Sequence, residues 1–93
     1  MNQDRLLVIQ SKLKRMALLL NIGGYPDWAN GLAELSNRLI VSPDVVRTEL
    51  LGLYGGMGSL NDLLLYKDGV LLFDENEEFD CLRAEVFNLV SYA

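Results

Sequence analysis

Residues 3–21 read QDRLLVIQSKLKRMALLLN and predict the longest helix of the chain. Apolar residues recur there at spacings of three and four, so they share one stripe along a helix. The stripe consists of Leu6, Ile9, Leu13, Met16, Ala17 and Leu20. Further apolar residues lie outside it, namely Leu7, Val8, Leu18 and Leu19. We therefore expect a central helix that packs on two sides. The alternative for its extra apolar face is a second protein interface.

A proline marks the start of the second predicted helix, because its fixed φ suits a first helical turn. This helix starts near Pro26, and Glu34 forms a favourable pair with Arg38, four residues further along. Its narrow apolar stripe consists of Trp28, Leu32, Leu35 and Leu39. We expect Trp28 to anchor the core rather than to stack on a ligand.

The third predicted helix follows Ser42 and Pro43, which suit the N-cap and the first turn. Its inward residues are Val46, Leu50 and Leu53. Three glycines follow between residues 55 and 58, without the lysine that a phosphate-binding loop needs. This segment is therefore predicted to be a structural tight turn, with Met57 filling a gap in the core.

Asp68 and Gly69 stand between two apolar runs and predict a two-residue β-turn. Residues 63–67 are then expected to pair with residues 70–73. The two runs do not alternate cleanly between apolar and polar residues, so a short helix is the alternative. An isolated hairpin is marginally stable in water, so this one must pack on the helices.

The last helix is expected at about residues 75–92, with Asp74 and Glu77 forming a capping box at its start. Its inward stripe consists of Phe79, Leu82, Val86, Leu89 and Val90, and Cys81 faces the surface. The chain is thus predicted to be a single domain over residues 1–93 and mainly α. It is a compact four-helix domain with a short β-hairpin between helices 3 and 4.

The residue types present argue against catalysis and against a metal site. The chain contains no histidine, which removes the commonest general base and the commonest metal ligand. Its one cysteine excludes a zinc site of the four-cysteine type. Paired carboxylates remain for acid–base chemistry, but short helices in 93 residues leave little room for a substrate cleft. We expect no enzymatic activity, no cofactor and no metal ion.

Hydropathy and cysteine content predict a cytoplasmic protein that does not associate with membranes. The longest apolar run, Met16 to Leu20, is far shorter than the roughly 20 residues that span a bilayer. The first residues lack the cationic region of a secretory signal. A single cysteine forms no internal disulfide, which favours the reducing cytosol.

Charge is distributed unevenly, and the C-terminal half is strongly acidic. Residues 1–50 contain six Lys or Arg and five Asp or Glu, whereas residues 51–93 contain two and eight. Nucleic acid is not expected as a partner because the net charge of −5 repels phosphate. A basic protein partner would be attracted.

Most of this acidity lies at the start of the last predicted helix. Asp74, Glu75, Glu77, Glu78 and Asp80 crowd seven positions, and Glu85 extends the charge along the helix. One interpretation is a solvated first turn that complements the helix dipole. The other is an acidic docking face for a cationic surface, because the cluster exceeds what one helix terminus needs. Tyr66, Phe73 and Tyr92 are nearby in sequence and are the candidate aromatic anchors.

Residues 55–65 read GGMGSLNDLLL, followed by the acidic segment NEEFDCLR at residues 76–83. This pattern resembles the signature of a small bacterial domain family that is similar to immunity proteins of contact-dependent growth inhibition systems. The resemblance covers about residues 50–89. It implies a cytoplasmic protein that binds and neutralises the C-terminal domain of a cognate toxin, often a nuclease, and it implies no catalytic residue. The alternative is a homo-oligomeric structural or regulatory subunit, such as a homodimer, without catalytic activity.

Overall fold

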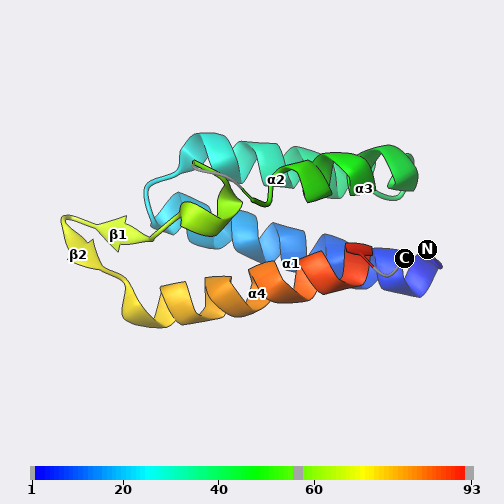
Figure 1. Ribbon diagram of the computed structural model, residues 1–93. Coiled ribbons are helices and arrows are strands. Elements are labelled where there is room, and N and C mark those ends of the chain that lie inside the picture. The colour runs from blue at the N-terminus through cyan, green and yellow to red at the C-terminus, as the bar shows by residue number, and fades with distance from the viewer. Residues whose placement is uncertain (1, 56–57, 92–93) are drawn as a thin grey trace.

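Helix α1 is the element against which α2 and α4 both pack, while α3 lies against α2 and α4 (Figure 1). The computed structural model describes residues 2–55 and 58–91. The elements are α1 (Gln3–Ile22), α2 (Pro26–Arg38), α3 (Pro43–Gly52), the 3-10 turn η1 (Leu60–Asp62), β1 (Tyr66–Lys67), β2 (Val70–Leu71) and α4 (Phe73–Ser91). The predicted fold class, four helices with a short β-hairpin between helices 3 and 4, is confirmed.

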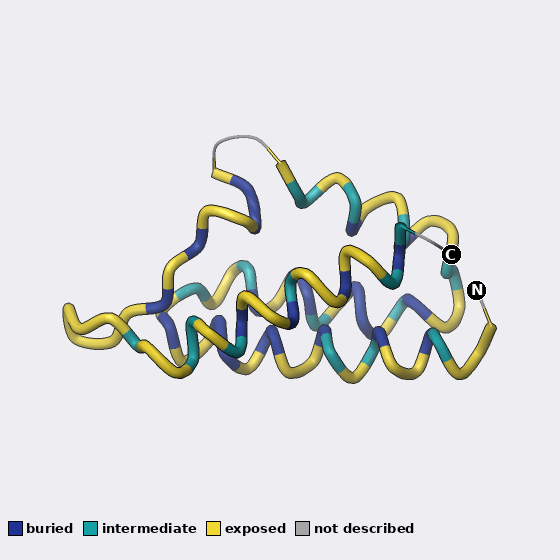
Figure 2. The backbone as a smooth tube through the Cα atoms, turned by 60° about the horizontal axis from the view of Figure 1, so that its bottom comes forward, coloured by how far each residue is buried: buried dark blue, intermediate teal, exposed yellow. Residues whose placement is uncertain are grey.

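Buried residues lie on the inner faces of the helices (Figure 2), and their side chains form one continuous core. The contribution of α1 consists of Leu6, Ile9, Leu13, Met16, Ala17, Leu19 and Leu20. This set contains the whole predicted stripe. Leu19, which lies outside that stripe, is also fully buried, because α2 and α4 cover two sides of the helix. Leu7 and Leu18 remain about half exposed on the outer side.

Two predicted helix caps are wrong in detail. Ser42 occupies the N-cap position of α3, but its hydroxyl caps none of the described amides, and only its carbonyl accepts a bond, from the amide of Val46. Asp74 and Glu77 form no capping box, because α4 begins at Phe73 and not at residue 75. The earlier start arises because the amide of Asn76 donates to the carbonyl of Leu72 at 2.9 Å, which closes the first turn.

The glycine-rich segment is a turn that its own side chains hold in place. The amide of Gly58, which has φ +72°, donates to Asp62 Oδ2 at 2.8 Å. The hydroxyl of Ser59 accepts from the amide of Asn61, and Leu60 is fully buried. The described part of the segment is therefore structural, as predicted. The predictions for Met57 and Tyr92 fall outside the described residues.

The predicted two-residue β-turn is confirmed, although the strands are shorter than expected. Tyr66 pairs with Leu71 and Lys67 with Val70 in antiparallel register. Asp68 and Gly69 both have positive φ, which is the backbone of a type I′ turn and matches the twist of a hairpin. The amide of Leu72 still donates to the carbonyl of Leu65 at 3.0 Å, but the amide of Leu65 donates to the side chain of Asn76, so regular strand pairing ends there.

The hairpin is fixed to the end of α1 by a close contact with Gly23. A Cβ atom at Gly23 would lie only 2.6 Å from Leu65 Cδ2 and 2.7 Å from Leu65 Cβ, so no larger residue fits without displacement. The amide of Tyr66 also donates to the Gly23 carbonyl, at 3.4 Å. Glycine at this position thus terminates α1 and also admits the segment that leads into the hairpin.

The side-chain amide of Asn76 holds the base of the hairpin against α4. Its Oδ1 accepts from the amide of Leu65 at 2.9 Å, and its Nδ2 donates to the carbonyls of Leu65 and Leu72 at 3.0 and 2.7 Å. Leu65 has no exposed surface, and its amide depends on this side chain, while its carbonyl also accepts from the amide of Leu72 at 3.0 Å. The position of the hairpin relative to α4 depends on this amide.

We predict that Gly23→Ala destabilises the fold. The added methyl group overlaps Leu65, so the free energy of unfolding should fall by about 1–3 kcal/mol. Urea unfolding followed by circular dichroism measures the change. Gly52→Ala is the matched control, because no described atom lies within 4 Å of a Cβ there. Equal stability of the Gly23→Ala and parent proteins would show that the contact is not tight.

We also predict that Asn76→Ala lowers the free energy of unfolding by about 2 kcal/mol, because it leaves the buried amide of Leu65 without a partner, whereas the carbonyl of Leu65 keeps its bond from the amide of Leu72. Asn88→Ala is the control on the same helix. Asn88 is exposed, so its replacement should change stability by less than about 0.5 kcal/mol. Both proteins gain the same helix propensity, and the difference between them isolates the hydrogen bonds. No difference would contradict the assigned role of Asn76.

Candidate functional site

The six acidic residues predicted to form a docking face fall into two groups. Three are bound within the molecule: Glu78 pairs with Arg15, Glu85 pairs with Lys12 at 2.7 Å, and Asp80 pairs with Arg83. The other three, Asp74, Glu75 and Glu77, form no salt bridge with any described residue. They lie in the first turns of α4, next to the hairpin. Glu78 and Glu85 thus join α4 to α1, and Asp80 pairs within α4. The structure therefore separates one continuous acidic stretch into carboxylates that are paired and carboxylates that remain available.

The pair between Glu78 and Arg15 joins α4 to α1 through two hydrogen bonds. Arg15 Nε donates to Glu78 Oε2 at 2.5 Å and Arg15 Nη2 donates to Glu78 Oε1 at 2.9 Å. These bonds lower the pKa of the Glu78 carboxyl, because they stabilise its ionised form. An external cation would have to compete with Arg15 for this carboxylate.

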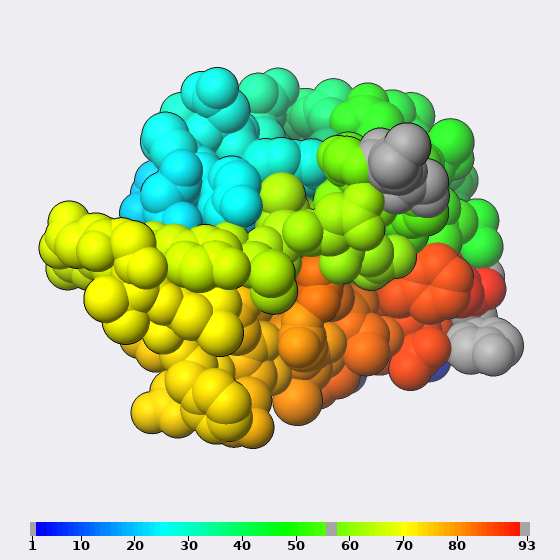
Figure 3. Space-filling view, turned by 60° about the vertical axis from the view of Figure 1, so that its left-hand side comes forward, coloured from blue at the N-terminus to red at the C-terminus, as the bar shows by residue number. Residues whose placement is uncertain are grey.

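Exposed apolar side chains lie on the hairpin and at the start of α4, next to the available carboxylates. Phe73 is 67 % exposed and Val70 is 65 % exposed, while Tyr66 and Leu71 are nearly half exposed. Together with Asp74, Glu75 and Glu77 they form a surface that we call the hairpin corner. Figure 3 shows the hairpin and the start of α4 side by side on one face. The corner thus combines three of the predicted acids with both described candidate anchors, Tyr66 and Phe73.

Asp80 and Glu85 are not part of the hairpin corner. They lie six and eleven residues after Asp74, which is about 9 and 16 Å along a helix. Val70 and Leu71, in contrast, join the corner although they were predicted only as strand residues. Their exposure could not be deduced from the sequence, because the two strands present apolar residues on both faces.

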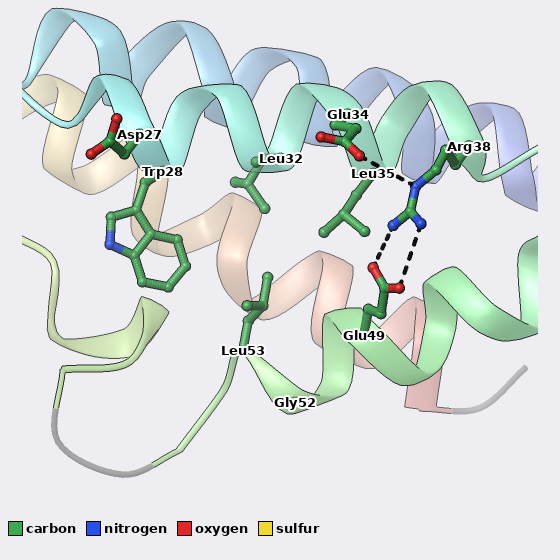
Figure 4. Close-up of a pocket in the computed structure, with 10 residues that line it drawn as sticks. Asp27, Trp28, Leu32, Glu34, Leu35, Arg38, Glu49, Gly52 and Leu53 are labelled. Carbon is green, nitrogen blue, oxygen red and sulfur yellow. Dashed lines mark hydrogen bonds and ion pairs between the residues drawn. The ribbon is translucent and has the colours of Figure 1, made fainter.

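A second surface feature, which the sequence patterns do not predict, is a groove of about 620 Å³ between α2 and α3. Figure 4 shows Trp28 at one end of it and the pair between Arg38 and Glu49 at the other. The groove is lined by Asp27, Trp28, Gly31, Leu32, Glu34, Leu35, Arg38, Glu49, Gly52 and Leu53. Trp28 packs against the core, as predicted, but it is only partly buried. The rest of its side chain lines the groove.

Arg38 connects α2 to α3 at the end of the groove opposite Trp28. It forms hydrogen bonds with both carboxylate oxygens of Glu49 on α3. The predicted pair with Glu34 is also present, although loosely, at 4.0 Å. The bond to Glu49 could not be predicted from spacing, because the partner lies on another helix.

Two further groups, Tyr54 and Cys81, lie outside the hairpin corner and the groove. Burial raises the pKa of the Tyr54 phenol to about 12, and its hydroxyl donates to the carbonyl of Arg83 at 2.9 Å. Cys81 is exposed, as predicted. Among the described residues, no cluster of three His, Cys, Asp or Glu side chains is placed to hold a metal ion. Within the same residues, no helix is both long and apolar enough to cross a bilayer.

Residues 22–72 match the sequence pattern of a family described as a domain of unknown function, DUF6966. The match extends from the last residue of α1 to the residue before α4 and covers more than half of the chain. It includes the groove helices and the hairpin. No match was found among curated proteins or among solved structures. The chain therefore belongs to the family of domains of unknown function DUF6966.

Proposed function

We propose that this protein is an immunity protein, without enzymatic activity, that binds and neutralises a basic bacterial toxin domain of the nuclease type. The observation that carries the proposal is the hairpin corner, where unpaired carboxylates stand beside exposed aromatic and aliphatic side chains. The sequence resemblance described above supports the same class of function. An immunity protein acts in the cytoplasm of the cell that it protects, where Cys81 stays reduced.

The charge of the hairpin corner suits an enzyme that holds nucleic acid. A nuclease needs a cationic surface to bind phosphates, and carboxylates at the corner occupy such a surface as phosphates would. Opposite charges also accelerate association, because they steer the two proteins toward each other before contact. Asp74 and Glu77 are exposed, so they can meet cations without first breaking an internal salt bridge.

Affinity would come mainly from the apolar part of the corner. Aromatic side chains that fill pockets on a partner provide most of the binding energy in typical interfaces, which bury roughly 800 Å² on each side. Phe73 is suited to this role because it is largely exposed and is also the first residue of a long helix. The helix restricts the backbone, so little conformational entropy is lost on binding.

We predict that Asp74→Asn/Glu77→Gln slows association with the toxin domain about tenfold at low salt and weakens its salt dependence. Stopped-flow fluorescence measures the rate, using the C-terminal domain of the toxin encoded by the neighbouring gene. Asp4→Asn/Asp44→Asn is the matched control. It removes the same charge from the first turns of two other helices, distant from the hairpin. Equal rates for the two variants would rule out the corner as the docking face.

The proposal as a whole is tested by co-purification of the chain with that toxin domain. A stable complex that abolishes nuclease activity is expected. A neighbouring gene that encodes no toxin, or two proteins that do not associate, would refute the immunity function itself. The rate comparison, in contrast, tests only which surface is used.

The second candidate function is a homo-oligomeric structural or regulatory subunit. It is favoured by exposed apolar residues on the outer side of α1, where Leu7, Leu18 and Ile22 are 49, 50 and 41 % exposed. Leu7 and Leu18 lie eleven residues apart, which is close to three helical turns and places them on one face. Size-exclusion chromatography with light scattering should then give a dimer that Leu18→Glu dissociates. A monomer at micromolar concentration would count against this function.

A further inference from the structure

The groove between α2 and α3 has the shape of an open trough rather than of an enclosed pocket. Its apolar floor is formed by Leu32, Leu35 and Leu53. Trp28 stands at one end and the Arg38–Glu49 pair closes the other, ten residues further along α2. Ten residues of helix span about 15 Å. The trough therefore has the length of two to three helical turns and is open along its side.

Two helical glycines keep the walls of this groove bare. Gly31 belongs to α2 and Gly52 to α3, and both line the groove. At each position, no described atom lies within 4 Å of where a Cβ would be, and the backbone has no positive φ. Neither helix packing nor backbone geometry thus requires glycine, although glycine is among the poorest helix formers. The absence of side chains at Gly31 and Gly52 leaves more open space inside the groove.

One edge of the groove carries negative charge. Asp27 and Glu34 lie seven residues apart on α2, so they face the same way with about 10 Å between them along the axis. Asp27 forms no salt bridge with any described residue, and Glu34 is 73 % exposed with only its loose contact to Arg38. The guanidinium of Arg38 is directed to Glu49 on the opposite helix. The edge is therefore complementary to two cations seven residues apart on another helix.

We propose that this groove binds a cationic amphipathic helical segment of a partner protein. Apolar side chains of that segment at positions i, i+4 and i+7 contact the leucine floor and the face of Trp28. Lysine or arginine residues, seven positions apart on one flank, pair with Asp27 and Glu34. Such helix-in-groove binding is a common mode of peptide recognition. The site is distinct from the hairpin corner and does not depend on the proposed immunity function.

The test uses a defined peptide and the fluorescence of Trp28, which is the only tryptophan of the chain. The probe is a 15-residue alanine–glutamine helix with leucines at its positions 5, 9 and 12 and lysines at its positions 4 and 11. A second peptide carries the lysines on the other flank, at its positions 6 and 13. In the control peptide, glutamates replace the lysines. We expect one of the two lysine peptides to cause a saturable blue shift of Trp28 emission, with a Kd of about 10–100 µM. The glutamate peptide should bind at least tenfold more weakly.

Variants of the groove separate binding from stability. Gly31→Ala should raise Tm by about 4 °C through helix propensity and yet weaken peptide binding about fivefold or more, because its methyl group enters the groove. Asn37→Ala is the matched control, since Asn37 is exposed on the same helix and does not line the groove. It should leave peptide affinity unchanged. Asp27→Asn/Glu34→Gln should reduce affinity and its salt dependence together.

Several results would overturn this proposal. They are the absence of a saturable shift with either lysine peptide, equal binding of the glutamate peptide, and unchanged affinity of Gly31→Ala. A response to monomeric octyl glucoside but to neither peptide would assign the groove to a small apolar ligand. A dimer in light scattering that Gly31→Leu dissociates would assign it to a second copy of the chain. The experiment contains no toxin, so its outcome is independent of the immunity test.

Discussion

Leu65 packs directly against Gly23, and this contact holds the start of the hairpin against the end of α1. On its other side, both backbone polar groups of Leu65 are bound by the amide of Asn76 at the start of α4. A single buried residue thus joins three elements that are distant in sequence. The hairpin has only two residues in each strand and could not hold this position alone. The hairpin corner exists because this connection places Tyr66 and Phe73 beside the carboxylates of α4.

The acidic character of the C-terminal half serves two different purposes. Glu78 and Glu85 join α4 to the cationic side of α1, which carries Arg15 and Lys12. Exposed pairs of this kind contribute little stability, commonly less than about 1 kcal/mol each, but they neutralise charge along the helix pair. The remaining negative charge is concentrated at the hairpin end and along one edge of the α2–α3 groove. A basic partner therefore meets two separate acidic regions rather than one uniform surface.

Local patterns predicted the helices and the turn well, because each depends on neighbouring residues. The stripe of α1, the proline starts of α2 and α3, and the turn at Asp68 and Gly69 are all examples.

Contacts between distant segments could not be predicted in this way. The sequence predicts no role for Asn76 and places Glu78 in a solvated or docking acidic cluster, whereas both bind other segments. Their partners lie eleven and sixty-three residues away, and no periodicity encodes such distances. The groove was missed for the same reason, since its two walls belong to different helices. Gly31 and Gly52, which stand inside the two helices without a packing reason, are the signal in the sequence that could have indicated it.

The shortness of the hairpin strands has a consequence for solubility. Long apolar edge strands tend to recruit strands of other molecules, which is a route to aggregation. Here the exposed apolar side chains of Val70 and Leu71 sit on a strand of two residues. At its base, the Asn76 side chain binds the amide of Leu65 and the carbonyl of Leu72, which a longer ladder would join to each other. The molecule can thus expose apolar side chains for binding a partner. It leaves too few free backbone amides and carbonyls for strands of other molecules to pair with it.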